Sequence, residues 1–339
     1  MLLDVFNGSA FNVIALTDAI NRIPYKPSRI GSMGLFDSRG VTTTSVMVEE
    51  VDKVLSLITT KARGGIPSAA AAEVRTARNF VIPHIPLDAT VRADEVQSVR
   101  AFGSQTELQG VAQVVNDKIA AMRQSHEVTL EYHRLGAIKG LVLDADGVTP
   151  VHNLFTEFNC TQLAPVVGGF AEFDFTGATP TVRNSCIAII RAIEGQLGGT
   201  PYDHIHCLCD STFFDGLTNE AGVLAAYDRW QAGAMLRDVS AMRSGFPYGG
   251  IIFEEYRGSV GTIPFIEAGA AYFFPVGAPG LFTTTFAPAD YIETVNTVGL
   301  PYYAKQSVMQ FDKGIVINTQ SNPLCLCTRP MTLVRARFV

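Results

Sequence analysis

Residues 104–134, SQTELQGVAQVVNDKIAAMRQSHEVTLEYHR, predict one long amphipathic helix around which the rest of the chain can be arranged. Apolar side chains recur three or four residues apart, so a single stripe faces the protein interior. The stripe consists of Leu108, Val111, Val115, Ile119 and Met122. At 1.5 Å per residue, a helix of about 22 to 28 residues would be roughly 33 to 42 Å long. Such a helix can serve as the spine of a domain, and we expect a β-sheet to begin near Thr129.

Composition and charge restrict the class of protein. The 339 residues are 47% hydrophobic and 17% charged, which allows one large core or two moderate ones. The formal net charge is -6 and no cluster of basic residues occurs, which argues against a protein that grips nucleic acid through its phosphates. The first residues carry no basic segment, and no run approaches about 18 apolar residues. We therefore expect a soluble protein that is neither exported nor bound to a membrane.

The N-terminal part of the chain predicts an arm followed by a long hairpin. Residues 1–34 form the arm, which has two apolar clusters followed by residues 23–34, where prolines and glycines argue against regular structure. Residues 35–95 contain β-branched, partly alternating segments on both sides of a flexible tip at Gly64 and Gly65, which predicts an extended β-hairpin. The hairpin has too little apolar surface to pack on its own domain. We therefore expect it to lie against a partner surface.

The rest of the chain predicts an α+β protein in which one domain is inserted into another. Residues 96–184 contain the long helix and three short strands of a peripheral domain. Residues 185–300 alternate helical and strand-like patterns and form the inserted α+β domain. Residues 301–339 provide strands whose expected place is the sheet begun by residues 129–158. The chain is thus predicted to leave a first domain, build a second, and return.

The segment GLVLDADGVTP, residues 140–150, resembles the first motif of haloacid-dehalogenase-type phosphatases. In that family the first Asp attacks phosphorus and the second is a general acid beside magnesium, roles that would fall on Asp144 and Asp146. Neither closing acidic motif of that family follows in this chain. Asp146-Gly147 between two β-rich runs also predicts a hairpin turn, since Gly supplies the positive φ of a type I′ turn. We favour the turn.

Two C-x-C pairs are the clearest candidates for metal ligands. They are Cys207 with Cys209 and Cys325 with Cys327. C-x-C is not the usual C-x2-C spacing of zinc sites, and alternation around the first pair predicts a buried strand in which cysteine acts as a small hydrophobe. His204 and His206 fall on the other face of that strand. With no carboxylate or third ligand expected nearby, we interpret both as structural or solvated residues.

Three short matches point to one protein family. Arg63–Gly65 lies at the hairpin tip, Tyr303–Lys305 precedes the final strands, and Gln320–Leu324 is similar to a Q-S-x-P-L phrase between such strands. Together with the order of arm, hairpin, spine helix, sheet, inserted domain and return strands, they resemble the Hong Kong 97 fold of tailed-phage major capsid proteins. The chain is specifically similar to the lambda-type major capsid protein E family. The resemblance covers nearly the whole chain and rests on order and length more than on any single motif.

The resemblance implies a structural protein and not an enzyme, with no cofactor and no metal. Many copies would form pentamers and hexamers of an icosahedral shell that encloses double-stranded DNA without sequence-specific binding. Residues 185–300 would form the axial domain at each capsomer's centre, and the hairpin would cross a neighbouring subunit. The expected intersubunit contacts are Lys61, Arg63, Gly64, Gly65, Arg75 and Arg78.

The resemblance also implies partners and a location. Scaffolding, portal and decoration proteins are the expected partners, and assembly in the host cytoplasm would place the chain in the virion capsid. Two other functions stay open at this point. An encapsulin-type compartment shell would share the fold but requires a cargo-binding pocket, and a magnesium phosphatase would use Asp144 and Asp146.

Overall fold

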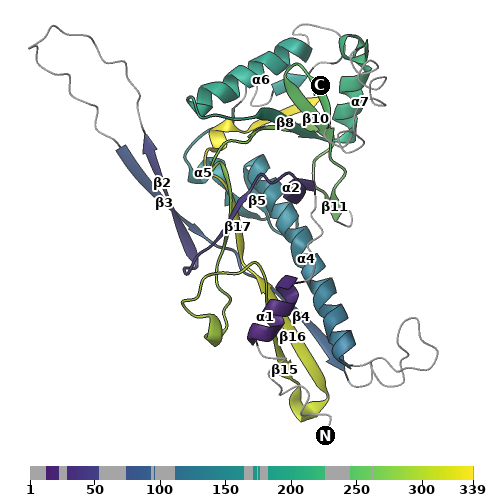
Figure 1. Cartoon of the computed structure of the whole chain (residues 1–339). Coiled ribbons are helices and arrows are strands. Elements are labelled where there is room, and N and C mark those ends of the chain that lie inside the picture. The colour runs from purple at the N-terminus through teal and green to yellow at the C-terminus, as the bar shows by residue number, and fades with distance from the viewer. Residues whose placement is uncertain are drawn as a thin grey trace, which may run out of the picture.

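The computed structural model describes residues 13–22, 29–52, 74–92, 95, 111–163, 171–173, 175, 182–225, 245–260 and 263–338 (Figure 1). The α-helices are α1 (Val13–Arg22), α2 (Arg29–Ser32), α4 (Val111–Lys139), α5 (Leu154–Glu157), α6 (Val182–Leu197) and α7 (Ser211–Asn219). The 3-10 helices are η5 (Ile292–Thr294), η6 (Gln310–Asp312) and η7 (Pro330–Thr332). The first strands are β1 (Asp37–Gly40), β2 (Ser45–Asp52), β3 (Val74–Val81), β4 (Ile85–Arg92), β5 (Leu141–Leu143), β6 (Pro150–Asn153), β7 (Ala171–Phe173), β8 (His204–Cys209) and β9 (Phe246–Tyr248). The remaining strands are β10 (Ile251–Glu255), β11 (Ser259–Val260), β12 (Ile263–Pro264), β13 (Ala270–Val276), β14 (Phe282–Phe286), β15 (Tyr303–Val308), β16 (Gly314–Ser321), β17 (Pro323–Cys327) and β18 (Val334–Phe338).

The long helix α4 runs through the molecule as the predicted spine (Figure 1). It continues through residues 129–136, where we predicted the start of a sheet, so that prediction is wrong. Leu130, Leu135 and Ile138 are all buried because this part of α4 packs against several strands, and burial on several sides hides the helical period. The helix ends at Lys139, and the next residue, Gly140, has a φ of 78° that is typical of the position after a helix C-terminus. Neither α4 nor any other helix in the described ranges has the length and apolarity needed to span a bilayer.

Above the end of α4 lies a six-stranded sheet with the order β7-β18-β13-β8-β10-β9 (Figure 1). One face, which includes Cys207, packs against α6 and α7 in a core with Ile193 and Phe213. The opposite face, which includes Leu208 and Phe274, packs with the last turns of α4. Both faces of β8 are therefore buried, with Cys207 on one face and His206 and Leu208 on the other.

The other end of α4 packs on a three-stranded antiparallel sheet with the order β15-β16-β4. The first helix, α1, covers the same core (Figure 1). Leu16 and Ile20 of α1, Ile119 of α4, and Ile315 and Ile317 of β16 are buried together there. The predicted apolar stripe of the spine helix is thus buried by segments from both ends of the chain.

The C-terminal strands pair differently from our prediction that they return to a sheet begun by residues 129–158. β16 pairs with β4, β17 pairs with β14, and β18 pairs with β13 and β7. Much of the expected sheet does not exist, since residues 129–139 are helical and β5 and β6 form only a two-stranded hairpin. The chain end therefore joins the six-stranded sheet. The division of the chain at residues 34, 95, 184 and 300 stays a prediction.

The end of the N-terminal arm contains the short helix α2, where we expected no regular structure. α2 follows the proline-rich part of the arm, and the Glu131 carboxylate of α4 accepts hydrogen bonds from its backbone N–H groups at Ile30 (2.7 Å) and Gly31 (3.3 Å). A carboxylate at the first turn satisfies N–H groups that have no partner within a helix. A tertiary contact thus stabilises a segment whose glycines and prolines disfavour regular structure.

Candidate functional site

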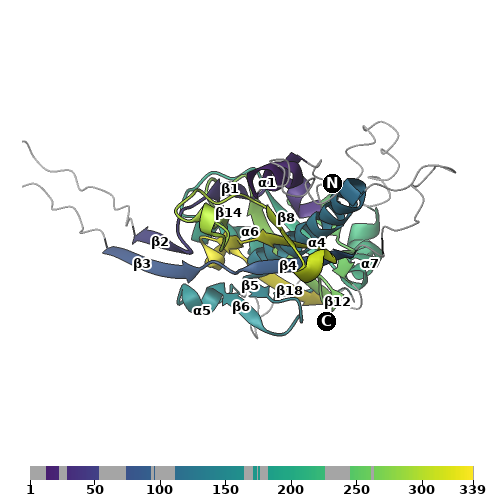
Figure 2. The same ribbon diagram turned by 90° about the horizontal axis from the view of Figure 1, so that it is seen from below.

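The hairpin of β2 and β3 projects away from the rest of the chain (Figures 1 and 2). The two strands are antiparallel, with pairs that run from Ser45–Val81 at the base to Asp52–Val74. This confirms the β-hairpin that alternation and β-branched residues predict for this part of the chain. Antiparallel pairing of this kind keeps the hairpin extended, although little of the rest of the chain lies beside it.

At its base the hairpin is fixed to the body by aromatic and polar contacts. The buried Phe80 ring lies 5.3 Å from the Phe158 ring and 5.9 Å from the His152 ring, between centroids. His152 Nε2 lies 2.9 Å from the carbonyl oxygen of Val81. Arg78 donates a hydrogen bond of 3.0 Å to the carbonyl oxygen of Phe158, and its guanidinium lies over the same ring. These contacts fix the angle at which the hairpin leaves the body.

The opposite face of the hairpin carries two exposed apolar side chains beside polar ones such as Asn79. Met47 and Val81 are 63% and 65% exposed, and both lie on the face opposite Phe80, because neighbouring residues in a strand alternate. Exposed large apolar side chains on a projecting element are typical of surfaces that another molecule covers. Nothing in the described body contacts this face closely enough to bury the two side chains.

The structure brings only one of the six predicted contact residues into view. Lys61, Arg63, Gly64 and Gly65 lie outside the described residues. Arg75 is paired with Val51 in the ladder, but its side chain also lies outside the described set. The Arg78 side chain contacts Phe158 of the same chain. Intersubunit contact by these six residues stays a prediction.

Asp144 and Asp146 form a turn, as the sequence favours. The amide N–H of Gly147 donates to the Asp144 carbonyl oxygen (2.9 Å), and the Asp146 carboxylate accepts hydrogen bonds from the amides of Val148 (2.9 Å) and Thr149 (2.8 Å). Hydrogen bonds from Thr149 and Val148 lower the pKa of Asp146. Of the turn residues only Gly147 has a positive φ, so the expected type I′ turn is wrong and the turn is type I followed by a left-handed Gly. A carboxylate engaged in its own turn explains the motif without phosphatase chemistry.

The two C-x-C pairs are buried in β8 and β17 and hold free thiols. Burial raises the pKa of Cys325 to about 11 and that of Cys327 to about 12, so both thiols stay protonated and are poor metal ligands. Across the part of the chain that the structure describes, no three Cys, His, Asp or Glu side chains are placed to hold a metal ion. The described structure therefore favours cysteine as a small buried hydrophobe.

The expectation that no carboxylate lies near His206 is wrong. Its Nε2 atom lies 3.0 Å from the Glu254 carboxylate, which also forms an ion pair with Arg29 of α2. Glu254 reaches this position because β10 is the parallel neighbour of β8 in the sheet. The sequence separates these two residues by a long segment, and only the strand order brings them together.

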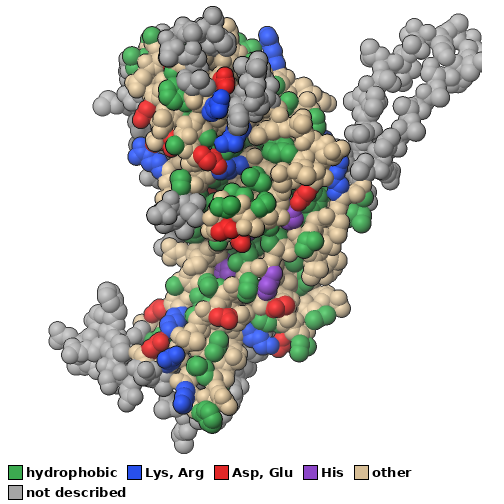
Figure 3. Space-filling model, turned by 180° about the vertical axis from the view of Figure 1, so that it is seen from behind, with side chains coloured by type: hydrophobic (Ala, Val, Ile, Leu, Met, Phe, Trp, Pro, Cys, Tyr) green, Lys and Arg blue, Asp and Glu red, His purple; other side chains and the backbone are tan. Residues whose placement is uncertain are grey.

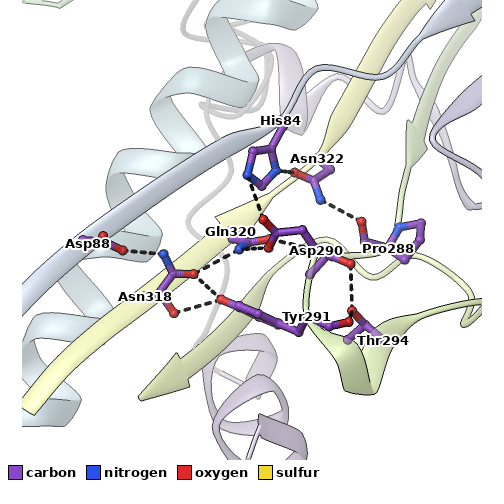
Figure 4. A network of polar contacts seen from close by, with 10 residues as sticks. His84, Asp88, Pro288, Asp290, Tyr291, Thr294, Asn318, Gln320 and Asn322 are labelled. Carbon is purple, nitrogen blue, oxygen red and sulfur yellow. Dashed lines mark hydrogen bonds and ion pairs between the residues drawn. The ribbon is translucent and has the colours of Figure 1, made fainter. Parts of the chain in front are cut away.

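A polar network that we did not predict holds the segment between β14 and β15 (Figure 4). Gln320 accepts a hydrogen bond from the Asp290 amide (3.3 Å), and its own amide group donates to Asp290 and to Asn318 (3.1 Å). Asn322 donates to the carbonyl oxygen of Pro288 (2.9 Å), and its side-chain oxygen lies 2.9 Å from His84 Nδ1. The Gln320–Leu324 phrase, which we noted for its family resemblance, is the sequence signal for this network.

Comparisons with known proteins agree with this structure. A family model described as phage major capsid protein E matches residues 12–338. The major capsid protein of Pseudomonas phage KPP10 is 27% identical over 353 residues, which cover 96% of this chain and 97% of that one. The major capsid protein of Salmonella phage Felix O1 is 26% identical over 362 residues, with 97% and 96% covered. Among solved structures, the capsid of Ralstonia phage GP4 is similar with a TM-score of 0.53 and 10% identity over 87% of this chain and 83% of that chain.

The structural similarity confirms the α+β capsid fold, and the family match covers most of the arm, the hairpin, the spine helix, the six-stranded sheet and the two three-stranded sheets. The chain belongs to the phage major capsid protein E family.

Proposed function

We propose that the chain is the main structural subunit of a phage capsid, and that it acts by assembly and not by catalysis. The observation that carries the proposal is the family match across residues 12–338, almost the whole chain. The two relatives named above are major capsid proteins and match over nearly their full lengths. This membership favours a capsid over the phosphatase and the compartment-shell alternatives.

In this proposal copies of the chain form pentamers and hexamers that close into an icosahedral shell. Residues 185–300 supply the axial domain, and the hairpin of β2 and β3 reaches a neighbouring subunit. The exposed Met47 and Val81 support this role for the hairpin, since a fixed base and uncovered apolar side chains suit an element that binds outside its own chain. Lys61, Arg63, Gly64, Gly65, Arg75 and Arg78 remain the proposed intersubunit contacts.

The surface charge is compatible with a shell that holds DNA loosely. The net charge is -6, and the described side chains on the face shown in Figure 3 mix acidic and basic groups without a broad basic area. Strong sequence-independent binding to DNA would need many Lys or Arg contacts to phosphates. The proposal places the chain in the virion after assembly in the host cytoplasm, with scaffolding, portal and decoration proteins as partners.

Light scattering coupled to size-exclusion chromatography, with electron microscopy of each peak, tests the proposed function. We expect capsomer-sized rings or closed shells, and we expect Asp144→Asn to assemble like the unchanged chain because Asp144 only shapes an exposed turn. Single chains at every concentration, together with magnesium-dependent phosphatase activity that Asp144→Asn abolishes, would contradict the proposal.

A further inference from the structure

The segment between β14 and β15, residues 287–302, exposes more apolar surface than a solvent-facing loop requires. Four of its aliphatic side chains are between 42% and 88% exposed. These residues, which we call the loop patch, are Ile292, Val295, Val298 and Leu300. Single exposed aliphatic residues are ordinary on protein surfaces, but four within one short loop indicate a binding surface.

The loop is held by hydrogen bonds between its own residues. The Thr294 hydroxyl donates to the carbonyl oxygens of Ala289 (2.8 Å) and Tyr291 (2.9 Å), and the Thr297 hydroxyl donates to that of Thr294 (2.7 Å). At the end of the loop, the amide of Leu300 donates to the hydroxyl oxygen of Tyr303 (2.8 Å). These bonds leave the apolar side chains on the outside while the polar groups of the loop face one another.

The same loop is fixed to the sheets behind it. The network in Figure 4 joins Asp290 and Tyr291 to Gln320 and Asn318 of β16. On its other side, the amide of Gly299 donates to the carbonyl oxygen of Val41 (2.8 Å). A loop held in this way loses little conformational freedom on binding, so its apolar side chains are preorganised for contact.

The loop lies beside the base of the hairpin. His84 lies between β3 and β4, and its Nε2 atom lies 3.7 Å from the Asp290 carboxylate in the loop. Figures 1 and 2 both place the loop on the side of the body from which the hairpin projects. The exposed hairpin face and the loop patch therefore belong to one side of the subunit.

We propose that the loop patch binds a second copy of this chain and forms, with the hairpin, a continuous intersubunit surface. The inference rests on the proposed function, in which many copies of the chain lie against one another. Asp290 is exposed next to the patch, and Glu293 is paired with Lys305 (2.9 Å). Strong binding to DNA phosphates needs many cationic side chains, whereas apolar side chains with polar groups around them are typical of a contact between proteins.

Ile292→Glu and Val298→Glu test the contact, with Val148→Glu as the matched control. Neither loop side chain takes part in the hydrogen bonds that hold the loop, so each variant should melt at the temperature of the unchanged subunit. Val148 is 79% exposed in the turn after β5, away from the loop. Placing a charge in a contact between copies should lower the fraction of chains in shells by roughly tenfold or more, while Val148→Glu assembles normally.

A photo-reactive side chain at residue 292 in assembled particles identifies the occupant. We expect a cross-link to a second copy of the chain, visible as a dimer on a denaturing gel. A cross-link only to a different protein, or normal shells from Ile292→Glu, would overturn the assignment while leaving the proposed function intact. If the unchanged chain forms no shells, the proposed function fails and the assignment of the loop patch fails with it.

Discussion

His126 and His133 lie inside the fold on α4, and burial lowers the pKa of each side chain to about 4. His126 Nε2 lies 3.0 Å from the Thr319 hydroxyl, and a hydrogen bond with the backbone of Thr319 raises the pKa of His126 by less than burial lowers it. Both imidazoles are therefore neutral in the folded chain at neutral pH. In the unfolded chain each takes up a proton near its ordinary pKa of about 6.5.

We predict that the subunit loses stability as the pH falls from about 6.5 toward 4. In this range the unfolded chain binds more protons than the folded chain, so the free energy of unfolding decreases with pH. Between about pH 6.5 and pH 5 each histidine accounts for a loss of about 2 kcal/mol. Urea unfolding at about pH 7.5 and pH 5 measures the effect. His126→Gln, and then His126→Gln with His133→Gln, should reduce the pH dependence in two steps, and an unchanged dependence in the double variant would contradict the prediction.

The hairpin of β2 and β3 divides into an anchored base and an outward face. Phe80 and Arg78 hold the base against Phe158, so the direction of the hairpin is set by the body. Met47 lies on the uncovered face. An element built in this way can lose its far end without loss of its own attachment.

We predict that deletion of residues 61–72 leaves a folded subunit that does not close shells. β2, β3 and the contacts at Phe80 lie outside the deleted segment, so the melting temperature should stay within a few degrees of that of the full chain. Calorimetry and electron microscopy measure the two properties. A full-length variant with Lys61→Gln and Arg63→Gln tests whether the charges of the tip matter or only its length. Each exposed ion pair contributes only about 0.2 to 1 kcal/mol, so this variant should affect assembly less than the deletion does. Normal shells from the deletion would show that the hairpin tip is not needed.

Across the whole molecule, the short helix α2 connects the spine helix with the six-stranded sheet. Glu131 of α4 accepts hydrogen bonds from Ile30 and from the Tyr256 hydroxyl (3.2 Å), while Arg29 pairs with Glu254 of β10. Three parts of the chain that are distant in sequence therefore meet at one small cluster. Its groups are largely buried, so removal of one charge leaves partners without their hydrogen bonds.

We predict that Glu131→Gln lowers the free energy of unfolding by about 1 to 3 kcal/mol. The amide keeps the volume of the side chain but can accept at only one of its two terminal positions, so Ile30, Gly31 and Tyr256 can no longer all be satisfied. Asp117→Asn, at an exposed position of the same helix, is the control and should change stability by less than about 0.5 kcal/mol. Equal stability of the two variants, measured by urea unfolding, would show that the cluster does not connect the parts of the fold.

Local sequence patterns were sufficient for the spine helix, for the existence of the hairpin and for the turn at Asp146-Gly147. Each of these depends on the spacing of apolar residues or on the backbone preference of one residue. The same local reasoning failed at residues 129–136, where burial on several sides of α4 replaced the helical period with a strand-like pattern. The type of the turn was also missed, since it depends on which amides donate hydrogen bonds to the Asp146 carboxylate.

Only the tertiary structure decided which strands pair and which surfaces stay open. The pairing of β18 with β13, the contact of His206 with Glu254, and the helix at Arg29–Ser32 all join segments that are far apart in sequence. The apolar residues of the loop patch do not recur at a regular spacing. They stay exposed because a hydrogen-bond network holds the loop against β16. The spacing of residues along the chain specifies a helix or a hairpin, because such an element forms its backbone hydrogen bonds within itself. The position of an element and its uncovered surface depend on neighbours that the spacing does not specify.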